Sequence, residues 1–555
     1  MLKKVRIAGL GIASTMLMSL GFVMPATAAS VPSGTVSTIL GEHAGKCIGV
    51  KGSSNAAGAL LQSQNCSDSG FQNWKMTKQS DNYYEIKNVA SGKCLDVTGW
   101  STVAGENLQQ WDCNGLETQR WNISDQGNGI FAIISKMSGL AVEVADASTQ
   151  NGGRIVQWDW MNQSHQRWSF PSSGSGGGNA GGDNPIGFGA NVTGGAGGEV
   201  VTVSTPEQLR TAITGNTPRI IRVSGSIDFR RTEGFTTGLG CTNSENYCSL
   251  NGKQEKILDR MDYCVGHSKY NITYDSAGVQ PLLVGSNKTI IGVGANSGIK
   301  GKGFRMVNGV SNIIIRNLSI TDINDGIVWG GDGITIDNAS RIWVDHNYFA
   351  RIARQFIVTG WGTAQQVTIS GNYLDGTTDY GHYCNRRHYW MMLFLAERQS
   401  ITLAGNRIHM GSGRSPKVGA NTNAQGGVVH MINNYLDQNY GSGADNMQQT
   451  TLLMEGNYFE KGTRFEPIAR SATSNPLFAP TSANIGYANN YCSSILGRSC
   501  VSNVDLNNSG NFVVNSSAMS NINANSNWRN VIRSVRPKRA SEVRSQRFGP
   551  QSDIK

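Results

Sequence analysis

The second half of the chain consists of short apolar runs, each of which ends at an Asn. β-Branched residues fill these runs, as in Ile313–Asn317 and Val367–Asn372. Successive Asn residues of this kind are 30, 25, 34, 28 and 23 residues apart. An irregular period of about 25 residues predicts the coils of a right-handed parallel β-helix with loops of different lengths, and Asn at a corner tolerates left-handed backbone geometry. The residues are Asn317, Asn347, Asn372, Asn406, Asn434 and Asn457.

The first part of the chain has another pattern, in which a Gln-x-Trp triplet recurs every 47 residues. The triplets occupy residues 72–74, 119–121 and 166–168, and short runs with Gly, Asn and Asp turns lie between them. A regular repeat of this kind predicts an all-β repeat fold. Residues 171–187 are rich in Gly and Ser, which is typical of a flexible linker between two domains.

The first 29 residues have the features of a signal peptide. Lys3, Lys4 and Arg6 precede an apolar run over residues 7–24, and small residues at 26–29 provide a cleavage site. The run is also about long enough to cross a bilayer, but its Gly and Ser content and the cleavage site favour export over a membrane anchor. No later segment of the sequence is long and apolar enough for a span. We therefore expect a secreted, extracellular protein without a membrane partner.

All ten cysteines follow this leader, and an even number in an exported chain predicts disulfides. Cys47 and Cys66 have the same spacing as Cys94 and Cys113. This spacing predicts the bridges Cys47–Cys66 and Cys94–Cys113 in two copies of one repeat.

The net charge of +10 is unevenly distributed along the chain. Residues 1–29 contribute +3, and residues 529–555 contribute +6 because eight Lys and Arg outnumber Glu542 and Asp553. The rest of the chain therefore carries only +1. We expect residues 529–555 to be a disordered basic tail, and we do not expect a nucleic-acid partner from charge alone.

Three charged residues stand out among the apolar β-rich segments. Asp332 and Arg354 lie on successive turns of the repeat, and Arg414 follows in the segment 413–418. One carboxylate and two guanidiniums suit a site that handles the carboxyl-ester end of a uronic acid.

Residues 190–525 resemble the pectin lyases of the pectate lyase superfamily (polysaccharide lyase family 1). The resemblance implies β-elimination, in which a base removes the proton at C5 and the C4 glycosidic oxygen leaves. It assigns the base to Arg414, with Arg354 at the ester carbonyl and Asp332 orienting Arg354. The shared motifs are residues 286–289, 299–303, 312–325, 329–335, 342–346, 350–355, 385–390 and 412–418.

The same resemblance implies further residues of the site and three more disulfides. Positive charge from Arg354 and Lys417 would lower the pKa of Arg414, and Trp361 is expected in the core. The implied substrate contacts are Lys417, Trp329, Trp390 and Tyr389, and the implied bridges are Cys241–Cys264, Cys248–Cys384 and Cys492–Cys500.

The position of Arg354 decides between two substrates. In pectate lyases several carboxylates hold calcium, but here a fixed cation stands where one of these carboxylates would be, and it repels Ca²⁺. We therefore expect no metal and no cofactor, with methyl-esterified polygalacturonate as substrate. The segment between Cys241 and Cys264 departs from the pectin lyases, since it has Tyr247 and Tyr263 but no Trp. The alternatives are a calcium-dependent pectate lyase, a non-catalytic cell-wall polysaccharide-binding protein and a hydrolase with clustered Asp residues.

The three triplet repeats resemble the ricin-B-like β-trefoil, a carbohydrate-binding module whose triplet Trp residues pack in the core. The resemblance implies sugar contacts in the second repeat through Asp96, Gln109, Trp111 and Gln119, and in the third through Glu143, Gln157, Trp158 and Gln166. The first repeat has Gly49 and Gln64 instead, so we expect it to be inactive. The module would bind plant cell-wall glycans.

The predicted organisation is thus all-β, and we expect a monomer. His382, Cys384 and His388 are not expected to bind a metal, and Asp345 with His346 is expected to support the site. The predicted parts are a signal peptide (1–29), the β-trefoil (30–170), the linker (171–187), the β-helix lyase domain (188–528) and the basic tail (529–555).

Overall fold

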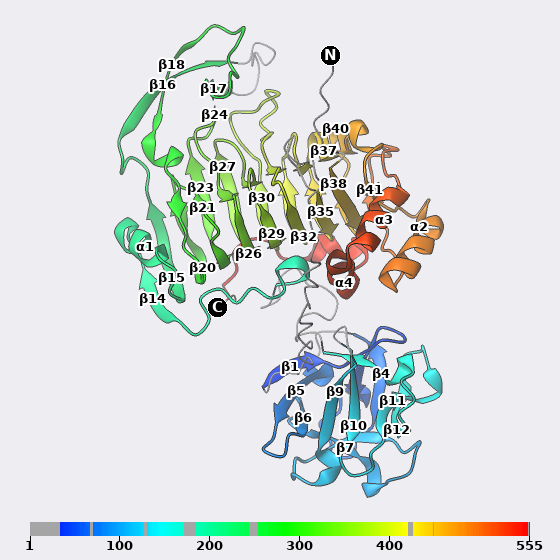
Figure 1. Ribbon diagram of the computed structural model, residues 1–555. Coiled ribbons are helices and arrows are strands. Elements are labelled where there is room, and N and C mark those ends of the chain that lie inside the picture. Colours follow the sequence, from blue (N-terminus) through cyan, green and yellow to red (C-terminus); the bar gives the residue numbers. More distant parts are fainter. Residues whose placement is uncertain are drawn as a thin grey trace, which may run out of the picture. The chain divides into compact units, whose positions relative to one another are not determined.

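The computed structural model describes residues 34–66, 70–126, 130–170, 185–242, 253–419, 426–447, 449–552 and 554. These residues form two compact units, one on each side of residues 171–184. Figure 1 shows the first unit in blue and cyan, and the second from green to red.

The first unit is a β-trefoil built around the three triplet tryptophans. Trp74, Trp121 and Trp168 are 0–1% exposed, and each indole N–H donates to a carbonyl 26 residues earlier in the chain, at 2.9–3.1 Å. The predicted core role of these residues is confirmed. The strands are β1 (Thr35–Thr38), β2 (Leu40–Gly41), β3 (Lys46–Val50), β4 (Leu61–Asn65), β5 (Asn73–Lys78), β6 (Tyr84–Asn88), β7 (Cys94–Val97), β8 (Leu108–Trp111), β9 (Trp121–Asp125), β10 (Phe131–Ser135), β11 (Ala141–Val144), β12 (Gly153–Trp158) and β13 (Trp168–Ser169).

The second unit is a parallel β-helix, so the predicted fold class is confirmed. Each coil passes through three columns of parallel strands, and Ile, Leu, Val and Phe side chains fill the space inside them. The first column contains β14 (Glu199–Val203), β15 (Arg219–Asp228), β20 (Lys288–Lys300), β22 (Ser311–Arg316), β26 (Ala339–Asp345), β29 (Ala364–Ser370), β32 (Gln399–Ala404), β35 (Gly427–Ile432), β38 (Thr450–Glu455) and β41 (Leu477–Phe478).

The second and third columns complete each coil. The second contains β23 (Ser319–Ile323), β27 (Tyr348–Ile352), β30 (Tyr373–Asp375), β33 (Arg407–His409), β36 (Tyr435–Asp437), β39 (Tyr458–Phe459) and β42 (Val504–Asp505). The third contains β19 (Leu282–Leu283), β21 (Phe304–Met306), β25 (Ile334–Ile336), β28 (Ile357–Thr359), β31 (Met392–Phe394), β34 (Lys417–Val418), β37 (Tyr440–Asn446) and β40 (Thr463–Ile468).

Short elements cover the ends and one edge of the β-helix. The helix α1 (Pro206–Ile213) buries Leu209, Ala212 and Ile213 at the first coils. The helices α2 (Ile485–Tyr491), α3 (Ser516–Ala524) and α4 (Ser526–Ser534) lie at the last coils (Figure 1). A small sheet of β16 (Phe235–Thr242), β17 (Lys256–Leu258), β18 (Tyr270–Asp275) and β24 (Ile327–Val328) projects beyond the coils. Within the described part of the chain, every helix is too short or too polar to span a bilayer.

An asparagine ladder stabilises the corner between the first and second columns. Each ladder Asn accepts from the backbone N–H and side-chain amide of the Asn one coil earlier, at 2.8–3.1 Å. The ladder continues to Asn503. Asn317 is not a ladder residue, because the backbone N–H of Leu318 donates to Asn347 at 3.0 Å. Asn317 lies one residue earlier and has the expected left-handed geometry, with φ 58°, as do the equivalent residues His346 and Gly371. The expectation was wrong for the five ladder Asn residues, none of which is left-handed.

Replacing Asn406 with alanine should lower the free energy of unfolding of the β-helix by about 3 kcal/mol. The Asn406 side chain is fully buried, and its loss removes the hydrogen bonds that it makes with the Ile369 carbonyl and the Asn372 N–H inside the fold. Calorimetry of the β-helix transition measures the change. Asn490→Ala, on the exposed face of α2, is the control, and an equal small shift in both variants would contradict the ladder's contribution.

The basic tail is ordered on the corner of the β-helix, so the prediction of disorder was wrong. Ile532, Val535, Ala540 and Val543 are each at most 5% exposed. These apolar residues recur between the charges and bury themselves against the coils, which a count of charge does not show.

Three predicted disulfides are present, namely Cys94–Cys113, Cys241–Cys264 and Cys492–Cys500. Cys47, Cys66 and Cys384 are each disulfide-bonded. Cys248, the predicted partner of Cys384, lies outside the described residues.

Candidate active site

Four site residues lie two or three residues before a strand of the third column, in four successive coils. Asp332 and Arg354 lie just before β25 and β28, and Trp390 and Arg414 lie just before β31 and β34. The strands are in register, with Ile334 opposite Ile357, Ile357 opposite Met392, and Leu393 opposite Lys417. Because successive coils are about 4.8 Å apart, this register gathers side chains that are up to 82 residues apart in the sequence.

Asp332 and Arg354 form a two-pronged ion pair. The Nε and Nη2 atoms of Arg354 donate to the two carboxylate oxygens of Asp332, each at 2.9 Å. The backbone N–H of Gln355 donates to the same carboxylate at 2.9 Å. On another side, the guanidinium carbon of Arg354 lies 4.0 Å from the ring centre of Trp329. The geometry fixes the guanidinium plane and leaves Nη1 without a hydrogen bond inside the described part of the chain.

Arg414 lies beside this pair and is connected to it by Gln355. The guanidinium carbon of Arg414 is 4.5 Å from the ring centre of Trp390 and 5.6 Å from that of Tyr389. With its side-chain amide turned to satisfy both neighbours, Gln355 accepts from Nη1 of Arg414 at 2.9 Å and donates to the Trp390 carbonyl at 3.2 Å. Sequence reasoning gave Gln355 no role, although it is part of the segment 350–355.

The charge of Arg414 is not neutralised as that of Arg354 is. Among the described residues no carboxylate forms an ion pair with Arg414, and its Nε is buried without a hydrogen-bond partner. Burial lowers the pKa of the Arg414 guanidinium, and the positive charge of Arg354 lowers it further, whereas Tyr389 and Tyr263 oppose the shift. The two guanidiniums thus differ in kind, one ion-paired and one held in an environment that favours loss of its proton.

A buried carboxylate, Glu255, holds the indole on which Arg414 lies. Glu255 is 6% exposed and accepts from Nε1 of Trp390 at 2.7 Å, and Nδ1 of His382 is 3.2 Å from its other oxygen. Trp390 is only 3% exposed, so its indole packs against Arg414 and presents little surface to a substrate. This differs from the expectation that Trp390 contacts the substrate. Glu255 was missed because 135 residues separate it from Trp390.

The remaining expected contacts differ in their surroundings. Tyr389 and Trp329 are half-buried at the site. Lys417 forms an ion pair with Asp445 at 3.0 Å, and the largest contributions to the pKa of Arg414 come from other groups. The expected effect of Lys417 on that pKa stays a prediction. Trp361 is 58% exposed, so it is not a core residue.

The donor atoms at the site do not suit a divalent cation. Both oxygens of Asp332 are engaged by Arg354, whose own charge would repel a metal. His388 Nε2 lies 2.7 Å from the Arg354 carbonyl, and burial lowers the pKa of His388. Asp345 and His346 are at most 1% exposed and contact each other at 2.7 Å at the corner that follows β26 of the first column. Asp345 also bonds to Arg316 and Ser370 and not to a site residue, so the expectation that this pair supports the site was wrong.

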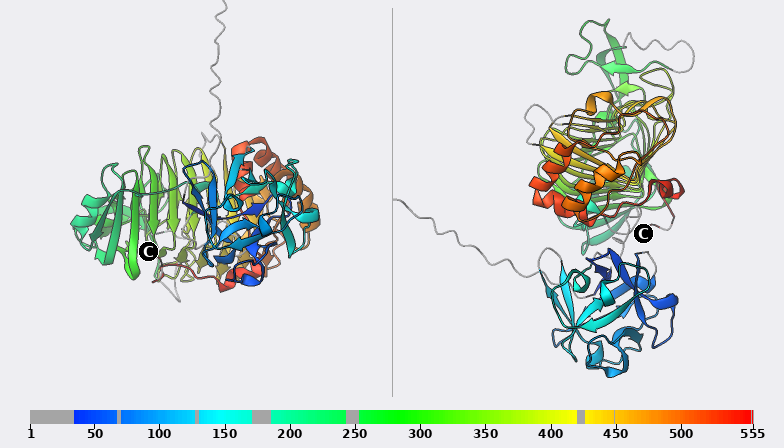
Figure 2. Two further views of the ribbon diagram at one scale, coloured as in Figure 1. Left: turned by 90° about the horizontal axis from the view of Figure 1, so that it is seen from below. Right: turned by 90° about the vertical axis from the view of Figure 1, so that its right-hand side faces the viewer.

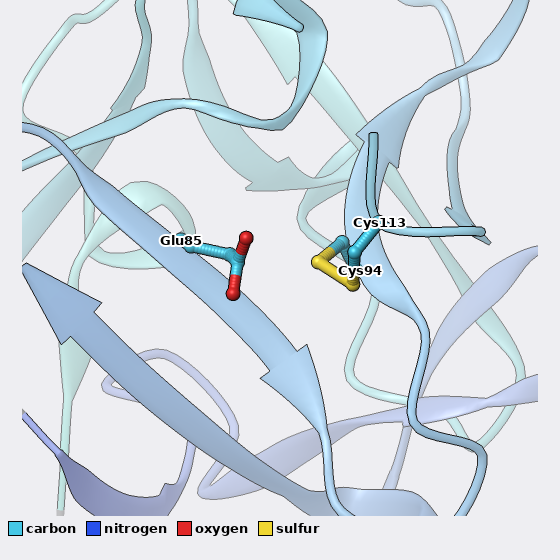
Figure 3. Close-up of side chains that lie close together, drawn as sticks. All are labelled: Glu85, Cys94 and Cys113. Carbon is cyan, nitrogen blue, oxygen red and sulfur yellow. A yellow bond between two sulfur atoms is a disulfide. The ribbon is translucent and has the colours of Figure 1, made fainter. Parts of the chain in front are cut away.

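Elsewhere in the described residues, two groups of three side chains have a metal-like arrangement. One is Glu85 with Cys94 and Cys113 (Figure 3), and the other is Glu455 with Cys492 and Cys500. In both groups the cysteines form a disulfide. Because a metal ligand must be a thiolate, neither group is a metal site.

In the trefoil, the second repeat brings its predicted sugar contacts together. Nε2 of Gln119 donates to Asp96 at 2.6 Å, and Gln109 is opposite Asp96 on the paired strand. Burial raises the pKa of Asp96. Trp111 is 41% exposed, which leaves an aromatic face beside these polar groups.

The third repeat has a similar arrangement, and the first does not. Nε2 of Gln166 donates to Glu143 at 2.7 Å, and Trp158 is 41% exposed. In the first repeat a Cβ at Gly49 would lie 2.9 Å from the Gln72 side chain, which fills the space.

One residue of the third repeat has a different role from the expected one. Gln157 corresponds to Gln110, because each donates to two carbonyls of the preceding repeat, at 2.8–3.0 Å. The expectation that Gln157 contacts sugar was wrong, since these bonds use its amide inside the fold.

Comparisons with known proteins agree with both units. The family described as "Pectate lyase" matches residues 243–529, and "Ricin-type beta-trefoil lectin domain-like" matches residues 27–111, 71–158 and 117–180. The architecture is that of a β-helical polysaccharide lyase joined to a ricin-B-like trefoil. The lyase match covers half of the chain, and the chain belongs to the pectate lyase family.

The similar relatives include two fungal proteins. "Probable pectin lyase F" of Neosartorya fischeri is 43% identical over 277 residues, which are 50% of this chain and 72% of the relative. "Probable pectin lyase A" of Aspergillus fumigatus is 41% identical over 318 residues, which are 57% of this chain and 80% of the relative. Among solved structures, a pectate lyase from Bacillus sp. N165 in complex with trigalacturonate has 23% identity and a TM-score of 0.34, covering 50% of this chain and 76% of that chain.

Proposed function

We propose that the chain is a secreted pectin lyase that cleaves methyl-esterified polygalacturonate by β-elimination without a metal. The observation that carries the proposal is the pair of unlike guanidiniums, Arg354 bound to Asp332 and Arg414 without a carboxylate. The pectin lyase names of relatives about 40% identical support the substrate. The disulfides suit an oxidising, extracellular destination.

The two guanidiniums have different roles in the proposed reaction. Arg414, in its neutral form, takes the proton at C5, which lies α to the ester carbonyl. Arg354 directs its free Nη1 to the carbonyl oxygen, where negative charge develops, and Asp332 keeps that donor in place. The electron pair of the C5–H bond becomes the C4–C5 double bond, and the glycosidic C4–O bond breaks. The leaving oxygen gains a proton, so no water is added to the polymer.

The site fits a methyl-esterified uronate better than the free carboxylate. A uronate carboxylate needs its charge neutralised before its α-proton becomes acidic, and calcium does this in a calcium-dependent enzyme. A methyl ester is already neutral, and one fixed cation at its carbonyl suffices. Asp332 has no free oxygen for calcium, because Arg354 and the Gln355 N–H occupy it.

Assays with two substrates and a chelator test the proposal. We expect unsaturated products from methyl-esterified pectin at least about tenfold faster than from polygalacturonate. Because no step uses a metal, we expect EDTA to change the rate by less than about twofold. Absorbance of the double bond near its ultraviolet maximum follows the reaction. Preference for polygalacturonate with loss of activity in EDTA would establish the calcium-dependent alternative, and absence of a double bond would leave a binding protein or a hydrolase.

We further propose that the trefoil binds cell-wall glycans and raises the local concentration of substrate. Its second repeat combines Asp96, Gln119 and an exposed Trp111. We expect Trp111→Ala to weaken binding to insoluble plant cell wall at least about tenfold, with a smaller effect for Trp158→Ala. Trp100→Ala is the control, since Trp100 is 66% exposed in the same repeat. Equal binding by the Trp111 and Trp100 variants, measured by pull-down, would refute the site.

A further inference from the structure

The C-terminal segment of residues 529–551, here called the basic strip, follows the outer corner of the β-helix. Its path begins in α4, and the Lys538 N–H donates to Oδ1 of Asn433 at 2.8 Å. Farther on, the Gly549 N–H donates to the Gly371 carbonyl at 2.8 Å, and the Gln551 N–H donates to Oδ1 of Asn317 at 2.7 Å. Figures 1 and 2 both show this red segment running from α4 back along the green coils.

These contacts give the strip a direction and a length. Asn433, Gly371 and Asn317 occupy equivalent left-handed corner positions in different coils, and Gly405 and His346 occupy the coils between them. From Asn433 to Asn317 is therefore four coil steps, or about 19 Å at about 4.8 Å per step. The three contacts lie along a line parallel to the axis of the β-helix, and between the first and second of them the chain includes the 3-10 helix Ala540–Ser545.

The strip gathers most of the excess positive charge of the protein. It has seven Lys and Arg residues against Glu542. Arg533, Arg539 and Arg547 are exposed. Arg544 forms an ion pair with Glu460 at 3.3 Å.

Several of its charges are not compensated by the protein. In the described part of the chain, neither Arg533 nor Arg536 nor Arg539 forms an ion pair with an acidic side chain. Burial lowers the pKa of Arg536 to about 10, and the nearby charges of Arg498 and Arg533 contribute to the shift, which the Glu455 carboxylate opposes. Positive charges thus lie close enough to repel one another, although the chain between residues 29 and 529 carries almost no net charge.

We infer that the basic strip is a second polysaccharide-binding surface, which takes runs of unesterified galacturonate. The inference rests on the proposed function, because partly esterified pectin presents neutral runs for the catalytic site and anionic runs elsewhere on the same polymer. An extended polyanion is also linear, as is the corner of the β-helix that the strip follows, and fixed guanidiniums bind carboxylates well. Binding an anionic run would hold the enzyme on a polymer whose esterified run it cleaves.

The experiment measures binding of full-length protein to polygalacturonate with the catalytic variant Arg414→Ala as background. This background separates the inference from the proposed function, because binding is measured without turnover. The test variant is Arg533→Glu with Arg539→Glu and Arg547→Glu. The control variant changes net charge equally at exposed Arg222, Arg398 and Arg470. Affinity electrophoresis and calorimetry at several salt concentrations give the dissociation constants.

We expect the test variant to bind polygalacturonate at least about tenfold more weakly at low salt, and the control to change by less than about threefold. Binding of polygalacturonate by the background protein should weaken as salt rises, whereas binding of fully esterified pectin, which the catalytic site and the trefoil retain, should be equal in the background, test and control proteins. Thermal unfolding must be unchanged in the test variant, and Arg→Gln changes at the three positions repeat the test if it is not. Equal weakening in test and control, or unchanged binding in the test variant, would overturn the inference. So would preferential binding of single-stranded nucleic acid that polygalacturonate fails to displace.

Discussion

Replacing Arg414 with alanine should lower kcat on methyl-esterified pectin about 10³-fold and leave KM nearly unchanged. A positioned general base contributes about 10²–10⁴-fold, and Arg414 is the one guanidinium of the site without a carboxylate partner among the described residues. Release of unsaturated uronide measures the effect. Arg398→Ala, at an exposed arginine of a neighbouring coil, should keep full activity.

Two further observations distinguish a base from a residue that only shapes the site. Since burial and Arg354 lower the pKa of Arg414, the neutral fraction is larger than that of a free arginine, and it still rises tenfold for each pH unit below the pKa. The wild-type rate should therefore increase with pH, and the residual rate of Arg414→Ala should not follow that increase. Added guanidine should restore part of the activity, because the indole of Trp390 and the amide of Gln355 remain to hold it. A variant with wild-type kcat would eliminate Arg414 as the base.

The fold was predictable because a β-helix repeats one physical problem in every coil. Each coil must bury apolar side chains and turn a corner, and these demands leave a visible spacing of β-branched runs and Asn. The register within a corner is not visible. Asn317 has the residue type expected at a corner, but it lies one residue before the ladder position, which Leu318 occupies. In the trefoil, Gln157 has the residue type expected of a sugar contact, but its structural equivalent in the second repeat is Gln110.

The site residues that lie within a recognised motif could be predicted from the sequence. Their hydrogen-bond and ion-pair partners could not be predicted where a distant segment of the chain supplies them. Asp332, Arg354 and Arg414 lie together as the motifs implied. Lys417 was assigned an electrostatic effect from its motif, but its ion pair with Asp445, one coil farther along, was not visible in the sequence. Glu255 lies one residue before β17 of the projecting small sheet and reaches Trp390 only through the fold. The basic tail was misjudged for a related reason, because the coils that bury Val535 and Val543 are far away in the sequence.

Replacing Arg354 should show whether its charge, its geometry or both are used. We expect Arg354→Met to lower kcat about 10³-fold or more, because it removes a donor at the developing oxyanion and also the charge that lowers the pKa of Arg414. Arg354→Lys keeps a positive charge but cannot engage both oxygens of Asp332 as the guanidinium does. Its loss should be smaller, about 10²-fold, and confined to kcat.

The pH dependence separates the two effects of Arg354. Without the neighbouring charge, the pKa of Arg414 rises, so the Met variant should need a higher pH than wild type to reach the same fraction of its own maximal rate. The Lys variant should keep a profile close to that of wild type. Asp332→Asn frees Arg354 from its ion pair and should resemble the Lys variant in magnitude, since the donor remains but is no longer fixed. If the Met and Lys variants lose equal activity with identical pH profiles, the charge of Arg354 does not act on Arg414, and the division of roles between the two guanidiniums is wrong.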